Sequence, residues 1–160
     1  MNFEYKKPRV KKAKKGVYMS WLKSMMEKEP PEPENPLGTI VIGNIEPDMH
    51  DTAKEAVRRT LKRAGFKTID VGKSVAPQIF VDKAKENNAD IIALSINTVP
   101  AKNNLAKLDD ALKAAGLKGK IAIIMGGAAV KKEDADAFGA LFGKNKEEAP
   151  ELAKKAMGKK

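Results

Sequence analysis

The sequence predicts an α/β protein built on a doubly wound, parallel sheet of five strands. Short, continuously apolar runs such as DIIALSI and KIAIIM alternate along the chain with longer segments of helical periodicity. Strands that alternate with helices are typical of βαβ units, whose strands run parallel. The strand runs lack alternating polar residues, which indicates burial on both faces of the sheet and therefore helices on both sides. We expect the strand order 2-1-3-4-5, one of the two common orders of such sheets.

Each predicted element has its own signal. The strands are short apolar or β-branched runs, at residues 39–42, 68–71, 90–96, 120–125 and 141–142. The helices place apolar residues three and four positions apart, at residues 50–64, 77–87, 101–115, 133–138 and 147–157. Gly65 and Gly116 mark the ends of two helices, and Pro77 suits the first turn of another.

Composition narrows the class of protein. The chain has 160 residues, which predicts one domain plus a tail. It has no cysteine, which excludes disulfides, thiolate zinc sites and iron–sulfur clusters. No run of about 18 apolar residues is present, so we expect no membrane span. The basic N-terminus lacks the apolar run of a secretory signal, and we therefore expect a cytoplasmic protein.

The N-terminal region carries a concentrated positive charge. Residues 6–15 contain seven cations and no acid, within a chain whose net charge is +10. Such a run can contact phosphates, but no aromatic residue is interleaved with it to stack on bases. We therefore expect a solvated tail and no nucleic-acid partner.

Residues 1–36 are predicted to lie outside the main domain. Residues 16–28 predict a short amphipathic helix, whose Trp21 and Met25 dock either on this protein's own core or on a partner. The Pro-rich stretch EPPEPENP that follows predicts an extended linker. Residues 37–160 then form the folded domain.

Three predicted loops meet where ligands of open parallel sheets bind, beyond the carboxyl ends of the strands at the switch point. They are residues 43–50, 95–100 and 126–129. The first loop and the residue after it, Asp51, contain three acids, and no glycine follows Gly43 there, which argues against a phosphate cradle for a flavin, NAD or ATP. The strand at residues 90–96 does not end in Asp, which argues against a phospho-acceptor receiver domain.

His50 is the only histidine, and Asp48 lies two residues before it. A carboxylate beside a histidine holds one ring N–H and leaves the other lone pair free, as in a metal-bound imidazole. The alternative is ordinary capping by Asp48, with His50 and Asp51 solvated in the first helical turn. One His and one Asp are too few for a closed zinc site, so a metal here should arrive already held by a macrocycle.

The other two loops offer room for a ligand. Ser95 supplies a hydroxyl at the end of its strand. The pair Gly126 and Gly127 removes side chains where a ligand could lie against the backbone, although a tight turn explains these glycines equally well.

These residues resemble a known family. The sequence DMHDTA at residues 48–53 is similar to the D-x-H-x-x-G motif of cobalamin-binding domains, with Ala53 in place of the glycine. Residues 65–72 and 89–95 are similar to the family's second and third strands, and Gly126-Gly127 to its double-glycine turn. The residues that follow His50 are closer to corrinoid methyl carriers than to carbon-skeleton mutases.

The resemblance implies a flavodoxin-like (Rossmann-like) fold that binds cobalamin in the base-off/His-on state. His50 would be the lower cobalt ligand, and Asp48 would orient its imidazole. The expected cofactor-binding residues come from the three loops: Asp48, Met49, His50, Asp51, Thr52, Ala53, Ser95, Asn97, Thr98, Gly126 and Gly127. The displaced nucleotide arm of the cofactor would lie between the sheet and its helices.

The implied function is to carry a methyl group on cobalt between a donor and an acceptor in a methyltransferase system. The chain would then be a corrinoid subunit with methyltransferase subunits as partners, and it is left open whether it is itself an enzyme. Residues 1–36 do not resemble the helical bundle that precedes this domain in methyl carriers. The resemblance therefore implies either a shortened or divergent carrier, or another chain that shields the cobalt. Two alternatives remain: the small subunit of an adenosylcobalamin-dependent mutase, and a cofactor-free interaction or regulatory module. Ala53 and Asn97, which stands where the family's S-x-L motif has Leu, favour the last.

Overall fold

A computed structural model, which describes residues 29–158, contains one five-stranded sheet in the order β2-β1-β3-β4-β5, with every neighbouring pair parallel. The strands are β1 (Thr39–Ile45), β2 (Lys67–Val75), β3 (Ile91–Ser95), β4 (Ala122–Gly126) and β5 (Leu141–Phe142). The predicted fold class and strand order are therefore confirmed. The basic run and the predicted helix with Trp21 and Met25 lie outside the described residues.

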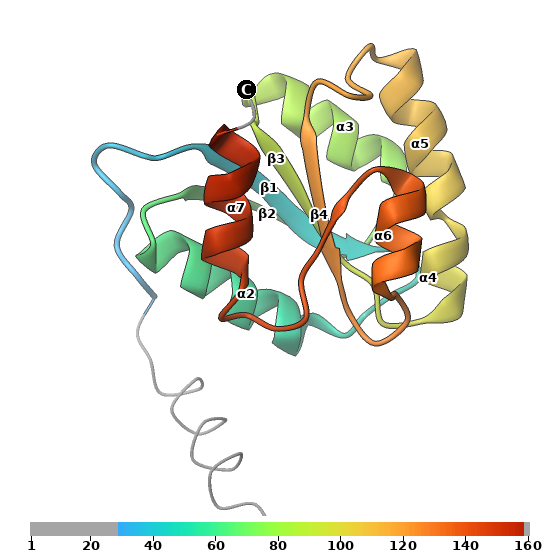
Figure 1. Cartoon of the computed structure of the whole chain (residues 1–160), viewed down its shortest axis with the longest axis horizontal. Coiled ribbons are helices and arrows are strands. Elements are labelled where there is room, and N and C mark those ends of the chain that lie inside the picture. Colours follow the sequence, from blue (N-terminus) through green and yellow to red (C-terminus); the bar gives the residue numbers. More distant parts are fainter. Residues whose placement is uncertain (1–28, 159–160) are drawn as a thin grey trace, which may run out of the picture.

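Helices cover both faces of this sheet (Figure 1). One face carries α2 (Asp51–Arg63) and α7 (Ala149–Gly158), and the other carries α3 (Pro77–Glu86) and α5 (Leu105–Ala114). Two short helices, α4 (Val99–Asn103) and α6 (Lys132–Phe138), complete the chain. No helix among residues 29–158 is long and apolar enough to cross a membrane.

The core has two layers because the strands are buried on both sides. Ile40 and Ile42 of β1 pack in the layer beneath α2 and α7, whereas Val41 and Ile45 pack in the layer beneath α3 and α5. Side chains alternate between the two faces along a strand. Asn44 therefore follows Ile42 on the α2/α7 face, at the carboxyl end of β1.

The structure divides the helix predicted at residues 101–115. Thr98 accepts a hydrogen bond from the Ala101 amide and caps α4, so that helix begins at Val99, before the predicted start. The break between α4 and α5 falls at Asn104, whose side-chain amide donates to the Glu46 carbonyl at 2.7 Å. This long-range contact joins the segment after β1 to the segment after β3.

The Pro-rich segment contacts α2. The Glu29 carboxylate accepts two hydrogen bonds from Arg58, at 2.6 and 2.8 Å, and one from Lys62 at 3.0 Å. Glu32 pairs with Lys62 as well, at 2.7 Å, and Pro30 is buried. The hydrogen bonds from Arg58 and Lys62 outweigh the cost of partial burial and hold the pKa of Glu29 at about 2.

These pairs predict a pH-dependent contribution to stability. Because the pKa of Glu29 is lowered from 4.5 to about 2 in the folded state, its contribution is complete above pH 4.5 and is lost as the pH falls toward 2. The side chain is partly exposed, so solvent screening limits this contribution to about 1 kcal/mol. Urea unfolding of the Glu29→Gln variant should show a loss of this size at pH 6 and almost none near pH 2. Glu34→Gln, in the same segment, should match the unsubstituted protein; an equal loss in both variants would contradict the assignment.

Candidate functional site

His50 stands at the carboxyl edge of the sheet, immediately before α2. Its side chain is 71% exposed, and its Nδ1 atom lies 2.8 Å from Oδ1 of Asp48, which is fully buried. A carboxylate only accepts hydrogen bonds, so the imidazole places its proton on Nδ1 and its lone pair on Nε2. Within the described part of the chain, Nε2 has no hydrogen-bond partner. Asp48 thus fixes the Nδ1 side of the ring, and the Nε2 side is free to accept a ligand.

Both carboxylate oxygens of Asp48 accept hydrogen bonds. Its Oδ1 takes the His50 amide at 3.0 Å in addition to the ring, and its Oδ2 takes Nδ2 of Asn44 at 3.2 Å. Asn97 donates to the same Oδ2 twice, from its amide at 2.8 Å and from Nδ2 at 2.9 Å. Burial raises the pKa of the Asp48 carboxyl, but these hydrogen bonds outweigh burial and hold the pKa below its usual range. The carboxylate is therefore ionised.

Asn97 joins the three predicted loops. Besides its two bonds to Asp48, Nδ2 of Asn97 lies 3.2 Å from Oγ of Ser95, and Oδ1 accepts the Ala128 amide at 3.1 Å. The loops after β1, β3 and β4 are thus connected through one side chain. An apolar residue at this position would leave both the Asp48 oxygen and the Ala128 amide with one partner fewer.

Asn44 is a member of this network to which sequence reasoning assigned no role. It is fully buried, and its Nδ2 donates to both Asp48 and the His50 carbonyl, the latter at 3.1 Å. Its Oδ1 has no hydrogen-bond partner among the described residues. The sequence signal that could have identified Asn44 is a polar residue within a buried apolar strand, because buried polar groups normally belong to a hydrogen-bond network.

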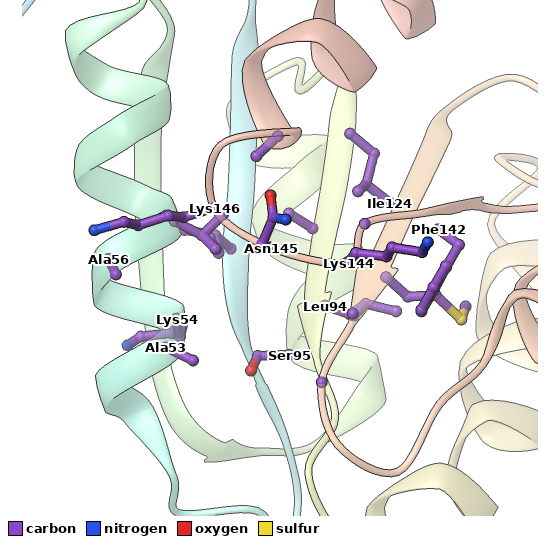
Figure 2. Close-up of a pocket in the computed structure, with 18 of the residues that line it drawn as sticks. Ala53, Lys54, Ala56, Leu94, Ser95, Ile124, Phe142, Lys144, Asn145 and Lys146 are labelled. Atoms are coloured by element: carbon purple, nitrogen blue, oxygen red, sulfur yellow. The ribbon is translucent and has the colours of Figure 1, made fainter. Parts of the chain in front are cut away.

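A cavity of about 460 Å³ opens beside this network, on the α2/α7 face of the sheet. Figure 2 shows its wall of α2 residues, among them Ala53 and Lys54, opposite strand residues that include Ser95 and Ile124. The segment between β5 and α7 contributes Lys144, Asn145 and Lys146. Of the predicted cofactor-binding residues, the cavity is lined by Ala53, Ser95, Asn97, Gly126 and Gly127.

The glycine pair has a structural cause of its own. A Cβ atom on Gly127, which has φ +124°, would lie 2.2 Å from the Ile96 carbonyl oxygen, and one on Gly126 would lie 2.7 Å from the Gly143 carbonyl oxygen. Both glycines therefore allow neighbouring backbone to approach closely. They also border the cavity, so a structural role in the turn is compatible with a role in ligand binding.

The remaining predicted residues surround His50 at the surface. Met49 is 55% exposed, an uncommon position for a large apolar side chain. Thr52 is exposed in the first turn of α2. Asp51 is partly exposed, 3.9 Å from Nζ of Lys73. The Thr98 hydroxyl serves as the cap of α4.

Comparisons with known proteins identify the family to which this domain belongs. A model of the B12 binding domain matches residues 38–153, nearly the whole described region. The chain belongs to the family of B12 binding domains. This confirms the predicted cobalamin-binding family and the predicted class of cofactor. The state of the cofactor and the role of His50 as cobalt ligand stay predictions.

The relatives of this B12 binding domain include named corrinoid proteins. Trimethylamine corrinoid protein 2 of Methanosarcina acetivorans is 39% identical over 122 residues, which cover 76% of this chain and 56% of that protein. Dimethylamine corrinoid protein 3 of Methanosarcina mazei is 38% identical over 125 residues, which cover 76% of this chain and 73% of that protein. The chain spans only 56% to 63% of the length of the trimethylamine corrinoid proteins it matches.

Solved structures agree on the fold. A cobalamin-binding protein from Desulfitobacterium hafniense is 32% identical, with a TM-score of 0.71 over 74% of this chain and 58% of that one. The monomethylamine corrinoid protein of Methanosarcina barkeri is 25% identical, with a TM-score of 0.68 over 72% of this chain and 56% of that one. The methanol:cobalamin methyltransferase complex of Methanosarcina barkeri is 22% identical and shares the fold, with a TM-score of 0.72 over 77% of this chain and 47% of that one.

The residues present fit a corrinoid. Among the described residues, no group of three or more His, Cys, Asp and Glu side chains could hold a bare metal ion. His50 offers one unpaired imidazole nitrogen, which suits a metal whose other positions a macrocycle already fills. The cavity beside it has room for an arm of the cofactor.

The network predicts a large effect of a small change at Asp48. In Asp48→Asn an amide replaces an acceptor that receives five N–H groups, so an N–H must face other N–H groups. We expect a loss of about 1–3 kcal/mol in the free energy of unfolding, measured in urea at pH 7. Asp51→Asn, three residues along and partly exposed, should lose less than about 0.5 kcal/mol. Similar losses in both variants would contradict the central role of Asp48.

Proposed function

We propose that this chain is a corrinoid-binding methyl carrier of a methyltransferase system, with His50 as the lower ligand of cobalt. One observation carries the proposal: the buried Asp48 fixes Nδ1 of His50, so that Nε2 faces outward at the carboxyl edge of the sheet. The names of the trimethylamine and dimethylamine corrinoid proteins, which are 39% and 38% identical to this chain over 122 and 125 aligned residues, support the methyl-transfer role.

Some of the chain's residues would contact the cofactor directly, and others would act by positioning those residues. His50 would hold the cobalt of the cofactor through Nε2, and Asp48 holds the imidazole in one tautomer and would strengthen it as a donor. Asn44 and Asn97 act through Asp48, because they fix the carboxylate that fixes the ring. When bound, the cobalt of the corrinoid supplies the chemistry of accepting and releasing a methyl group, and the protein supplies position and electrostatics.

The surface around His50 suits a flat macrocycle. Exposed apolar side chains stand on both flanking loops, Met49 after β1 and Val99 after β3. In the proposed complex these two side chains would contact the macrocycle. The residues at this edge would hold the macrocycle, and the residues that line the neighbouring cavity would hold its nucleotide arm.

The partners we propose are the methyltransferase subunits that deliver and remove the methyl group. In this proposal a surface of a partner subunit, and not the described residues, would cover the exposed side of the macrocycle. Cytoplasmic location stays a prediction.

The single histidine allows a direct test of the ligand. Protein labelled with [¹⁵N]histidine and loaded with cob(II)alamin should change the three-line nitrogen splitting of its electron paramagnetic resonance spectrum to two lines, because His50 is the only labelled residue. His50→Ala should lose the protein-derived splitting and keep its circular dichroism spectrum. Asp110→Asn, at an exposed position of α5 away from the cavity, should behave as the unsubstituted protein does. An unchanged three-line spectrum with the label would show that the cofactor's own base remains bound, and failure to bind cobalamin would favour a cofactor-free module.

Ala53 gives a second test. Its methyl group lies at the cavity, where the D-x-H-x-x-G motif has glycine, so Ala53→Gly should tighten cobalamin binding by relieving contact with the cofactor. The same change should lower the free energy of unfolding by up to about 1 kcal/mol, because glycine is a poor helix former. Ala106→Gly, at an exposed position of α5, should show the same unfolding loss without any change in affinity. Weaker cobalamin binding by Ala53→Gly would show that the methyl group makes a favourable contact.

A further inference from the structure

The carboxyl end of β2 departs from regular strand geometry. Asp70 and Val75 are five residues apart, whereas their partners on β1 are only three residues apart. The additional residues are accommodated by left-handed backbone, at Gly72 with φ +99° and at Ser74 with φ +51°. This conformation is unfavourable for a residue other than glycine, and such positions are concentrated at functional sites. The irregular end of β2 therefore requires contacts that stabilise it.

This end of β2 holds the backbone of the loop that carries His50. The Ser74 amide donates to the Asp48 carbonyl at 2.8 Å, and the Glu46 amide donates to the Val75 carbonyl at 2.9 Å. Asp48 is thus held in two ways: β2 fixes its backbone, whereas β1 and the loop after β3 supply donors to its carboxylate. A change in the shape of β2 at this point would move Asp48 and the imidazole that its carboxylate fixes.

Asp70 and Lys54 stabilise the irregular end of β2. Oδ1 of Asp70 accepts the Gly72 amide at 2.8 Å, which fixes the backbone where the register first shifts. Nζ of Lys54, near the start of α2, lies 2.9 and 3.0 Å from the two carboxylate oxygens of Asp70, and Glu55 lies farther away, at 3.4 Å. The Lys54 side chain is only 3% exposed, and a buried ammonium is tolerated only where it is paired. Lys54 therefore ties α2 to the end of β2 through Asp70.

We propose that Lys54 and Asp70 are positioning residues for His50, because their ion pair keeps β2 in the shape that holds the backbone of Asp48. The inference rests on the proposed function, since it concerns the orientation of the imidazole that would bind cobalt. Residues that modulate a site without touching its ligand change binding by about two- to thirtyfold. We expect effects of this size on the imidazole and on cobalamin binding.

The first test observes the imidazole without any cofactor. His50 is the only histidine, so ¹⁵N-labelled histidine reports its two ring nitrogens alone. In alkaline buffer, where the ring is neutral, the nitrogen chemical shifts of the unsubstituted protein should show mainly the Nδ1–H form. Lys54→Met should shift the ratio of the two forms toward Nε2–H by about two- to thirtyfold. The control Lys118→Met, which removes an ion pair with Asp109, should leave the ratio unchanged.

A matched pair of glycine variants separates positioning from a general loss of stability. Gly72→Ala and Gly139→Ala each place a Cβ atom in open space at a left-handed φ, +99° and +84°, so both should be less stable. Gly72 shapes the end of β2, whereas Gly139 ends α6, and neither lines the cavity. Only Gly72→Ala should shift the tautomer ratio of His50. Equal shifts in both variants, or no shift in either, would overturn the proposal.

The second test measures cobalamin binding by absorbance titration. Lys54→Met and Gly72→Ala should each weaken binding by about two- to thirtyfold, and Gly139→Ala should stay within about twofold. The double variant Lys54→Met/Asp70→Asn should bind no more weakly than the weaker of its two single variants, because the two residues act as one unit. A loss in the double variant equal to the product of the single losses would contradict this coupling.

The two tests distinguish this proposal from the proposed function. A tautomer ratio that shifts as expected, in a protein that binds no cobalamin, would retain the positioning role and reject the proposed function. Cobalamin bound through His50 in every variant, with an unchanged tautomer ratio, would reject the positioning role and retain the proposed function.

Discussion

The site depends on one buried charge. The carboxylate of Asp48 is fully buried, and an ion in such a position is tolerated only when hydrogen bonds replace the water it has lost. Five N–H groups do so here, and they come from β1, from His50 and from the loop after β3. Each donor stabilises the charge, and the charge in turn holds each donor in place. The orientation of the His50 ring is a consequence of this mutual requirement.

The parallel sheet makes the arrangement possible. Carboxyl ends of neighbouring strands meet at one edge, so residues that are far apart in the sequence converge there. Asn44 and Ser95 are register partners on β1 and β3, and Asn97 follows Ser95 by two residues. The Ala128 amide, from the segment after β4, reaches the same side chain. The switch point is thus both a gap for a ligand and the meeting place of the groups that stabilise Asp48.

The His50 network and the cavity occupy different regions of the domain. His50 and its supporting network occupy the edge of the sheet, whereas the cavity lies between the sheet and the α2/α7 layer. Both regions are bordered by residues at the carboxyl end of a strand or within two residues of it, namely Ser95, Asn97, Gly126 and Gly127. This proximity explains why Gly126 and Gly127 can serve the protein's own backbone and still line the cavity.

The sequence by itself determined the fold class, the strand order and the pairing of Asp48 with His50. The strands are buried on both faces and therefore read as continuous apolar runs, and the Asp–His contact is local, two residues apart. The break at Asn104 and the roles of Asn44 and Asn97 were decided only by the tertiary structure. Each depends on partners that are distant along the chain: Asn104 reaches Glu46, and Asn97 joins Asp48 to Ala128. A pattern in sequence records local geometry and burial, whereas a hydrogen-bond network between loops exists only after the strands that carry those loops have been placed side by side.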